Sequence, residues 1–197
     1  MTLILASASR SRAQLLSAAG LDFTSVPAQI DEEEVRRSLV AAGKDGAVIA
    51  EALAERKALK ISTARPKDLV IGADQILSFD GEILGKVTDL NEAEHLLRRL
   101  RGKAHLLLGG IVLARNGAPV WRHRSRAQLW MREFSDEFLL QYLRCEGPAV
   151  LETVGCYRLE GAGIQLFDAI EGDYFAILGL ELLPLMAALR EQGVVAA

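Results

Sequence analysis

The chain has 197 residues, of which half are apolar and a quarter charged, so it suits a single globular domain with a sizeable core. Its formal net charge of −3 excludes the global basic field of a nucleic-acid-binding protein, so an anionic ligand needs local positive charge. The two cysteines form no CxxC pair, and the first apolar stretch is too short for a signal peptide or a membrane span. We therefore expect a cytoplasmic protein without a nucleic-acid or membrane partner.

Helical and strand-like segments alternate along the chain. Strands are predicted at residues 3–6, 23–26, 69–73 (continued by 76–79), 104–114 and 118–131. Helices are predicted at residues 13–19, from 31 onward, and at 45–61, 89–100, 135–144 and 182–191. Asp80-Gly81 and Asn116-Gly117 mark hairpin turns, and glycines among short strands fill residues 155–179. The pattern predicts an α/β fold with a mixed sheet, in one domain of residues 1–197 whose larger lobe ends near residue 130.

The segment LASASRSRAQLL, residues 5–16, passes from a strand through two serines and two arginines into a helix. The free N–H groups of a helix start, the hydroxyls of Ser7 and Ser9, and the guanidinium groups of Arg10 and Arg12 would together hold a phosphate. The alternative is a helix capped by serine with its arginines in solvent.

The segment IGADQILSFDGEILGK, residues 71–86, places Asp74 and Gln75 inside an apolar run. An ionised carboxylate costs several kcal/mol to bury unless it is paired, hydrogen-bonded or bound to a metal. Neighbouring residues of a strand point to opposite faces, so one of the two lines something polar, and Gly72 allows close approach of a ligand. The alternative is that the strand ends at Ala73 and Asp74 caps a turn.

Two lysines and a further acidic residue extend these candidates. Lys57 lies on a predicted helix, and Lys86 follows the 80–81 hairpin. With Arg12, Glu32 and Asp74 they would form a site for a metal-bound triphosphate, in which cations hold phosphates and carboxylates hold the metal. Solvated lysines are the alternative, because spacing does not show convergence.

The C-terminal segment carries Glu160 beside Gly161, which suits either a loop that reads a nucleobase or plain turns between strands. The three histidines, His95, His105 and His123, lack the spacing of a zinc site. No Walker A, Rossmann or GxSxG motif is present.

Taken together, these segments resemble the Maf family of nucleoside triphosphate pyrophosphatases, in order and over nearly the whole chain. The segments that carry the resemblance are LASASRSRAQLL, IDEEE, AERKA, VIGADQI, GEILGK, GKAH and GCYRLEGAGI…IEGDYFAILGL. The resemblance implies an elongated, Maf/ITPase-like α/β fold with a cleft between two lobes. It also implies metal-dependent hydrolysis between the α- and β-phosphates, with Mg²⁺, Mn²⁺ or Co²⁺ as the cation.

By this resemblance Asp74 is the catalytic carboxylate, as general base or as metal partner, and Glu32 assists with the metal or water. Ser7, Arg12, Lys57 and Lys86 are expected to hold the triphosphate of the nucleotide substrate; these four belong to matched motifs of the family. The family also includes homodimers, so a homodimer is one option for this chain.

Base preference rests on three positions. Gln75 and Glu160 match the branch of the family that acts on 7-methyl-GTP, whereas the branch that acts on dTTP and UTP has Thr and Gln there. A carboxylate accepts two hydrogen bonds from guanine that uracil does not offer. Arg10 replaces the family's proline, and Ser11 replaces a Trp or Arg, so the sequence predicts a broadened or altered range of modified nucleotides.

The leading hypothesis is thus a house-cleaning pyrophosphatase. The alternative from another class is a nucleotide-binding regulator of cell division and septum formation without turnover, which fits the family's association with those processes. A third is a purely structural α/β domain.

Overall fold

The computed structural model describes residues 2–196. The strands are β1 (Leu3–Leu5), β2 (Thr24–Ser25), β3 (Leu69–Phe79), β4 (Glu82–Leu84), β5 (Ala104–Arg115), β6 (Ala118–Met131) and β7 (Phe167–Glu171). The helices are α1 (Arg10–Ala18), α2 (Glu32–Ala41), α3 (Gly46–Ala64), α4 (Leu90–Leu100), α5 (Asp136–Glu146), α6 (Tyr174–Ile177) and α7 (Leu182–Glu191), with 3₁₀ segments η1 (Gly147–Glu152) and η2 (Ala162–Leu166).

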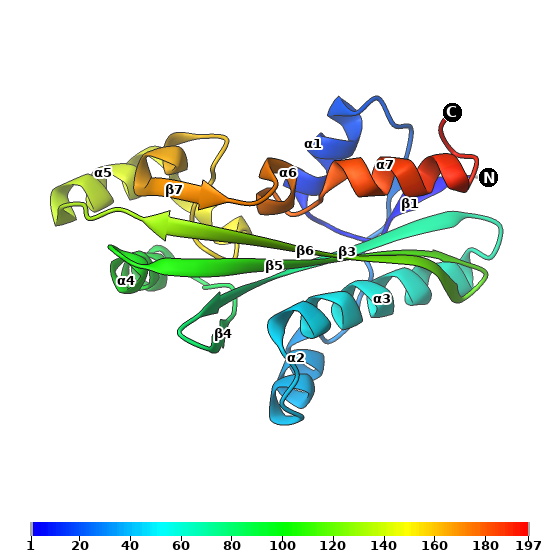
Figure 1. The fold of residues 1–197 in the computed structure, drawn as a ribbon, viewed down its shortest axis with the longest axis horizontal. Helices are drawn as coiled ribbons and strands as arrows, with labels where there is room; N and C mark the ends of the chain where they lie inside the picture. Colours follow the sequence, from blue (N-terminus) through cyan, green and yellow to red (C-terminus); the bar gives the residue numbers. More distant parts are fainter. Residues whose placement is uncertain (1, 197) are drawn as a thin grey trace.

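The strands form one seven-stranded sheet in the order β2-β1-β3-β5-β6-β7, with β4 paired to β3 (Figure 1). Strand β1 is parallel to β2 and β3, and all other pairs are antiparallel. The expected α/β class with a mixed sheet is confirmed. Helices α1 and α7 cover one face near the N-terminal strands, and α3 covers the other (Figure 1).

One edge of β3 is shared by two short strands and is open between them. Residues 69–71 pair with β1, and residues 77–79 pair with β4. Residues 72–76 therefore have no strand beside them on that edge, although β5 pairs with them on the other. This gap gives side chains from both faces of β3 access to one space, and Asp74 and Gln75 lie in it.

Helix α3 lies close against the sheet because Gly72 has no side chain. A Cβ atom on Gly72 would lie 2.0 Å from the carbonyl oxygen of Ala54 in α3. The expectation that Gly72 makes room for a ligand is therefore wrong, since the helix takes that space. The close contact sets Lys57, one turn further along α3, beside Asp74.

Two apolar clusters lie on either side of Asp74 along β3. Leu69, Ile71 and Ala73 pack with α1 and α7, whereas Leu77 and Phe79 pack with α4, α5 and the end of β6. The strand continues through Asp74, so the alternative that it ends at residue 73 is wrong. The polar pair stands where one core ends and the next begins.

The helix caps predicted at Asp45, Asp89 and Ser135 are confirmed. Asp31, Asp45, Asp89 and Ser135 each accept a hydrogen bond from the backbone of the helix that they precede. The two hairpin turns take left-handed backbone angles, as their sequences predict. None of the helices between residues 2 and 196 is long and apolar enough to cross a membrane.

The C-terminal expectation was partly wrong. Residues 155–179 contain one strand, β7, with η2 before it and α6 after it, instead of several short strands. Asp173 explains α6, because its carboxylate accepts a hydrogen bond from the N–H of Ala176 at 2.8 Å and starts a helical turn.

His105 on β5 is buried in the core of the protein. Its side chain is 2% exposed, and its Nε2 atom lies 2.7 Å from the hydroxyl of Tyr157. Burial lowers the pKa of His105 to about 4 from its ordinary 6.5. The neutral ring is thus the form that the fold accommodates.

We expect acid to destabilise the fold through His105. The unfolded chain takes up a proton below about pH 6.5 and the folded chain only below about pH 4, so stability falls as the pH drops through that window. Between pH 7 and pH 4.5 this loss amounts to about 2 kcal/mol. Urea unfolding of the wild type and His105→Phe at both pH values measures it. An equal pH dependence in both proteins would contradict the assignment.

Candidate active site

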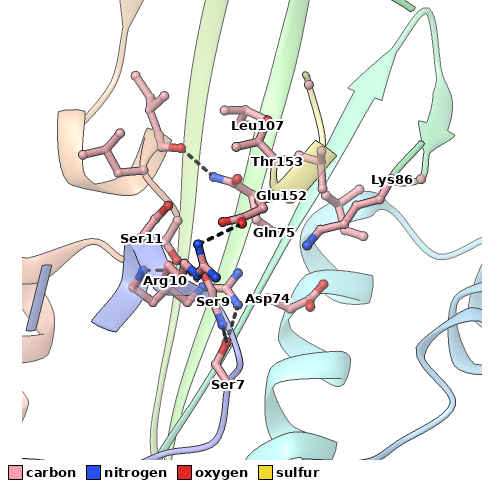
Figure 2. A pocket seen from close by; sticks show the side chains of 18 of the residues that line it. Ser7, Ser9, Arg10, Ser11, Asp74, Gln75, Lys86, Leu107, Glu152 and Thr153 are labelled. Carbon is pink, nitrogen blue, oxygen red and sulfur yellow. Dashed lines mark hydrogen bonds and ion pairs between the residues drawn. The ribbon is translucent and has the colours of Figure 1, made fainter. Parts of the chain in front are cut away.

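A cleft of about 550 Å³ opens at the gap along β3. Residues 74–76 of β3 lie at its centre. The β1–α1 turn, α2 with α3, the end of β4, Leu107 of β5, the segment from the end of η1 to residue 160, and the end of α6 complete the lining. In Figure 2, Asp74 lies between Ser11 and Arg10 on one side and Lys86 on the other. All the candidate residues from the sequence line this cleft: Ser7, Ser9, Arg10, Ser11, Arg12, Glu32, Lys57, Asp74, Gln75, Lys86 and Glu160.

The β1–α1 turn directs two serines and one arginine to the floor of the cleft. Ser9 caps α1 by accepting from the N–H of Arg12 at 3.4 Å, while the Ser7 hydroxyl accepts from the N–H of Ser9 at 3.2 Å. The Arg12 guanidinium donates to the Ser7 hydroxyl at 3.3 Å. Ser9 thus starts the helix, whereas the Ser7 hydroxyl lies beside the guanidinium of Arg12.

Arg12 joins the turn to the open strand edge. Its Nη1 donates to the carbonyl oxygen of Ala73 at 2.9 Å, and its Nε donates to that of Gly179 at 3.0 Å. Burial lowers the pKa of Arg12, and the charges of Asp74 and Glu32 act in the opposite direction. No carboxylate within the described residues forms a salt bridge with Arg12, so its positive charge faces the cleft uncompensated by a direct partner.

Lys57 connects the two acidic residues of the site. Its ammonium donates to Asp74 at 2.6 Å and lies 3.0 Å from Glu32. The Lys57 and Asp74 side chains are 7% and 9% exposed, whereas Glu32 is 43% exposed. One positive and two negative charges leave the trio with a net negative charge, which a bound cation would offset.

Lys86 supplies positive charge at the mouth of the cleft. In Figure 2 its ammonium points into the cleft from the end of β4. Desolvation by the cleft lowers the pKa of Lys86; Arg12 and Lys57 lower it further, and Glu32 and Asp74 oppose them. The side chain itself is exposed, so a ligand can reach it without the protein moving.

The far end of the cleft is less charged. The Gln75 amide donates to the carbonyl oxygens of Ala176 and Ile177 at 2.8 and 3.2 Å, so it holds α6 in place. Ser11 and Glu160 line the same end, and Glu160 forms a salt bridge with Arg158 at 3.2 Å. With its amide nitrogen engaged by the backbone, Gln75 has its carbonyl oxygen left for a ligand.

Arg36 and Glu152 line the cleft but were not among the candidates from the sequence. Arg36 on α2 lines the cleft, forms a salt bridge with Glu33 at 2.7 Å, and lies against Gly85. Arg10, named from the sequence as a candidate for holding phosphate, reaches Glu152 across the cleft at 3.7 Å (Figure 2). Charged residues on helices usually face solvent, so the spacing of Arg36 and Glu152 in the sequence did not indicate a place in the cleft.

Glu32 and Asp74 suit a divalent cation that takes only one or two ligands from the protein. No three His, Cys, Asp or Glu side chains gather as a metal-binding group anywhere in residues 2–196. Mg²⁺ is commonly bound by one or two carboxylates together with substrate phosphates. Glu32 and Asp74, both within hydrogen-bond reach of Lys57, fit that arrangement.

Comparison with known proteins identifies the family of the chain. The family model described as "Maf-like protein" matches residues 2–192. A nucleoside triphosphate pyrophosphatase of Granulibacter bethesdensis is 50% identical over 191 residues, which cover 97% of each chain. A 7-methyl-GTP pyrophosphatase of Rhizobium meliloti is 48% identical over 195 residues, covering 99% of this chain and 98% of the relative. The protein therefore belongs to the Maf family, and the resemblance drawn from its motifs is confirmed.

We expect the two partners of the buried salt bridge to differ in what their loss costs. Lys57→Met would leave Asp74 buried without a partner and near Glu32, whereas Asp74→Asn leaves the lysine paired with Glu32 and its amide oxygen still able to accept. Loss of the lysine should therefore cost about 3 kcal/mol of unfolding free energy, and the Asn variant about 1 kcal/mol. Urea unfolding at pH 7 measures both. Equal losses would show that Glu32 does not hold the lysine.

Proposed function

We propose that the protein hydrolyses nucleoside triphosphates between the α- and β-phosphates, giving a nucleoside monophosphate and pyrophosphate. The observation that carries the proposal is the convergence, in one cleft, of Ser7, Arg12 and Lys86 with the trio of Lys57, Asp74 and Glu32. The names of close relatives over nearly the full chain support the same reaction.

The cations would hold the phosphate chain. Arg12 offers a guanidinium fixed by two backbone carbonyls, and Ser7 offers a hydroxyl beside it. Lys86 adds an ammonium that the ligand can reach from solvent. Preorganised donors of this kind stabilise the charge that builds on the phosphates as the bond breaks.

Asp74 would act on the attacking water or on the metal. As general base it would accept the proton of the water that attacks phosphorus; as metal partner it would share a divalent cation, Mg²⁺, Mn²⁺ or Co²⁺, with Glu32. A bound cation of this kind neutralises phosphate charge and acidifies bound water. In either role Lys57 fixes the carboxylate from the side of α3 through a hydrogen bond of 2.6 Å.

The base would lie at the end formed by Ser11, Gln75 and Glu160. A Glu160 carboxylate can accept hydrogen bonds from the N1–H and amino group of a guanine, which supports a guanine nucleotide, including 7-methyl-GTP. Ser11 provides no ring or guanidinium for stacking on a methylated base, and this favours a broader range of modified or non-standard nucleotides.

We expect Asp74→Asn to lower pyrophosphate release at least 100-fold, because loss of a positioned base or metal-binding carboxylate removes its transition-state contribution. The assay follows pyrophosphate and orthophosphate separately, with Mg²⁺ or Mn²⁺. Asp173→Asn, in which the amide oxygen still caps α6, is a control outside the site.

Release of orthophosphate alone by the wild type would contradict the proposed reaction. Tight nucleotide binding without any product would instead favour a regulator that does not turn over its ligand.

We expect Glu160→Gln to shift preference from guanine toward pyrimidine nucleotides. An amide presents one acceptor and one donor where the carboxylate presents two acceptors, so the GTP-to-UTP ratio of kcat/KM should fall about tenfold. A panel of 7-methyl-GTP, GTP, CTP, UTP and dTTP measures it. An unchanged ratio would remove Glu160 from base recognition.

A further inference from the structure

Behind Glu160 lies a chain of charged groups that does not touch the cleft. Arg158 Nε lies 3.2 Å from Glu160, and its Nη1 lies 3.3 Å from Glu146 at the end of α5. Among the described residues lining the cleft, Glu160 is present, whereas Arg158 and Glu146 are not. A ligand in the cleft therefore meets Glu160 while Arg158 supports it from behind.

The Glu146 end of this chain is fixed firmly. The Glu146 side chain is only 8% exposed, and its second oxygen accepts a hydrogen bond from the N–H of Ala162 at 2.8 Å. A Cβ atom on Gly161 would lie 2.6 Å from that same oxygen, so the absence of a side chain there lets the loop close on the carboxylate. A buried carboxylate is costly unless it is paired, and here both oxygens have partners.

The loop is also tied to itself. The N–H of Gly161 donates to the carbonyl oxygen of Arg158 at 3.1 Å, which places Glu160 inside a closed turn. Glu146 thus holds the loop at two points: the guanidinium of Arg158 and the backbone of Ala162. The carboxylate of Glu160 is then limited in its orientation by Arg158 from one side.

We infer that Arg158, anchored by Glu146, is a positioning residue that presents the Glu160 carboxylate to the base and so contributes to base discrimination. The inference rests on the proposed role of Glu160 in reading the base. A long acidic side chain loses conformational freedom when it binds, and a partner that fixes it beforehand removes that entropic cost. The effect belongs to binding of the guanine base and not to the chemistry at phosphorus.

The test compares kcat and KM for GTP and UTP in variants of the full chain. Arg158→Met should raise KM for GTP about fivefold, with kcat for GTP and both constants for UTP nearly unchanged. Arg158→Lys, which retains the charge beside Glu160, should recover most of the lost affinity. Arg144→Met, an exposed arginine on the same helix as Glu146, is the matched control and should match the wild type.

A second variant separates positioning from loop folding. In Glu146→Gln the amide oxygen still accepts from Ala162, but the amide nitrogen no longer pairs with Arg158. It should raise KM for GTP about threefold while the thermal midpoint stays close to that of the wild type. If Arg158→Met does not fold, this variant decides alone.

The results separate the positioning role of Arg158 from the base-reading role of Glu160. If Glu160→Gln changes the GTP-to-UTP ratio while Arg158→Met and Glu146→Gln both behave like Arg144→Met, the positioning role is overturned and base reading stands. If Glu160→Gln leaves the ratio unchanged, base reading fails and the positioning role fails with it. Equal losses for GTP and UTP in Arg158→Met would assign Arg158 to loop stability instead.

Discussion

The site depends on one interruption in strand pairing. Strand β3 is long, but β1 and β4 each pair with only three of its residues on one edge, so residues 72–76 are left open between them. A backbone edge inside a protein needs other partners, and the guanidinium of Arg12 provides one for the carbonyl of Ala73. The same gap lets Asp74 and Gln75, on opposite faces of the strand, line a single cleft.

Negative and positive charges lie at different places along the cleft. The charges of Lys57, Asp74 and Glu32 sum to a net negative charge, whereas Arg12 and Lys86 form no salt bridge with any carboxylate of residues 2–196. A phosphate chain without a metal would be repelled by the carboxylates of Asp74 and Glu32 and attracted by Arg12 and Lys86. A metal-bound phosphate chain satisfies both parts at once, which is why the arrangement suits a cation and a triphosphate together better than either alone.

Most helices, strands and hairpin turns could be predicted from the sequence, because helix caps, turn residues and apolar runs are local signals. Asp74 stood out since an ionised group in a buried strand needs a partner. Its partner, Lys57, was a candidate for holding phosphate, but its pairing with Asp74 was not predicted, because their contact depends on how closely α3 approaches β3 at Gly72. That packing is a property of the assembled fold, and the sequence alone suggested a ligand there instead.

The features that escaped prediction share a physical cause. Arg36, Glu152 and Arg158 lie on helices or turns where charged residues ordinarily face solvent, and only the folded chain shows which of them face the cleft or support it. Residues 155–179 were expected to form strands because glycine marks turns of many kinds. The N–H groups of Ala162 and Ala176 donate hydrogen bonds to the carboxylates of Glu146 and Asp173, and these bonds decide the form of the segment. The contact with Glu146 joins residues far apart in the sequence, and no local pattern shows it.

The most direct measurement of the central claim is Mn²⁺ binding followed by electron paramagnetic resonance, with and without an α,β-methylene analogue of GTP that resists cleavage. With only Glu32 and Asp74 assigned to the cation, the account predicts weak binding of the ion alone and binding at least about tenfold tighter once the analogue is present. Removing the carboxylate at position 74 should abolish that gain. Equally tight ion binding without the analogue, or a gain that survives the substitution, would contradict the account.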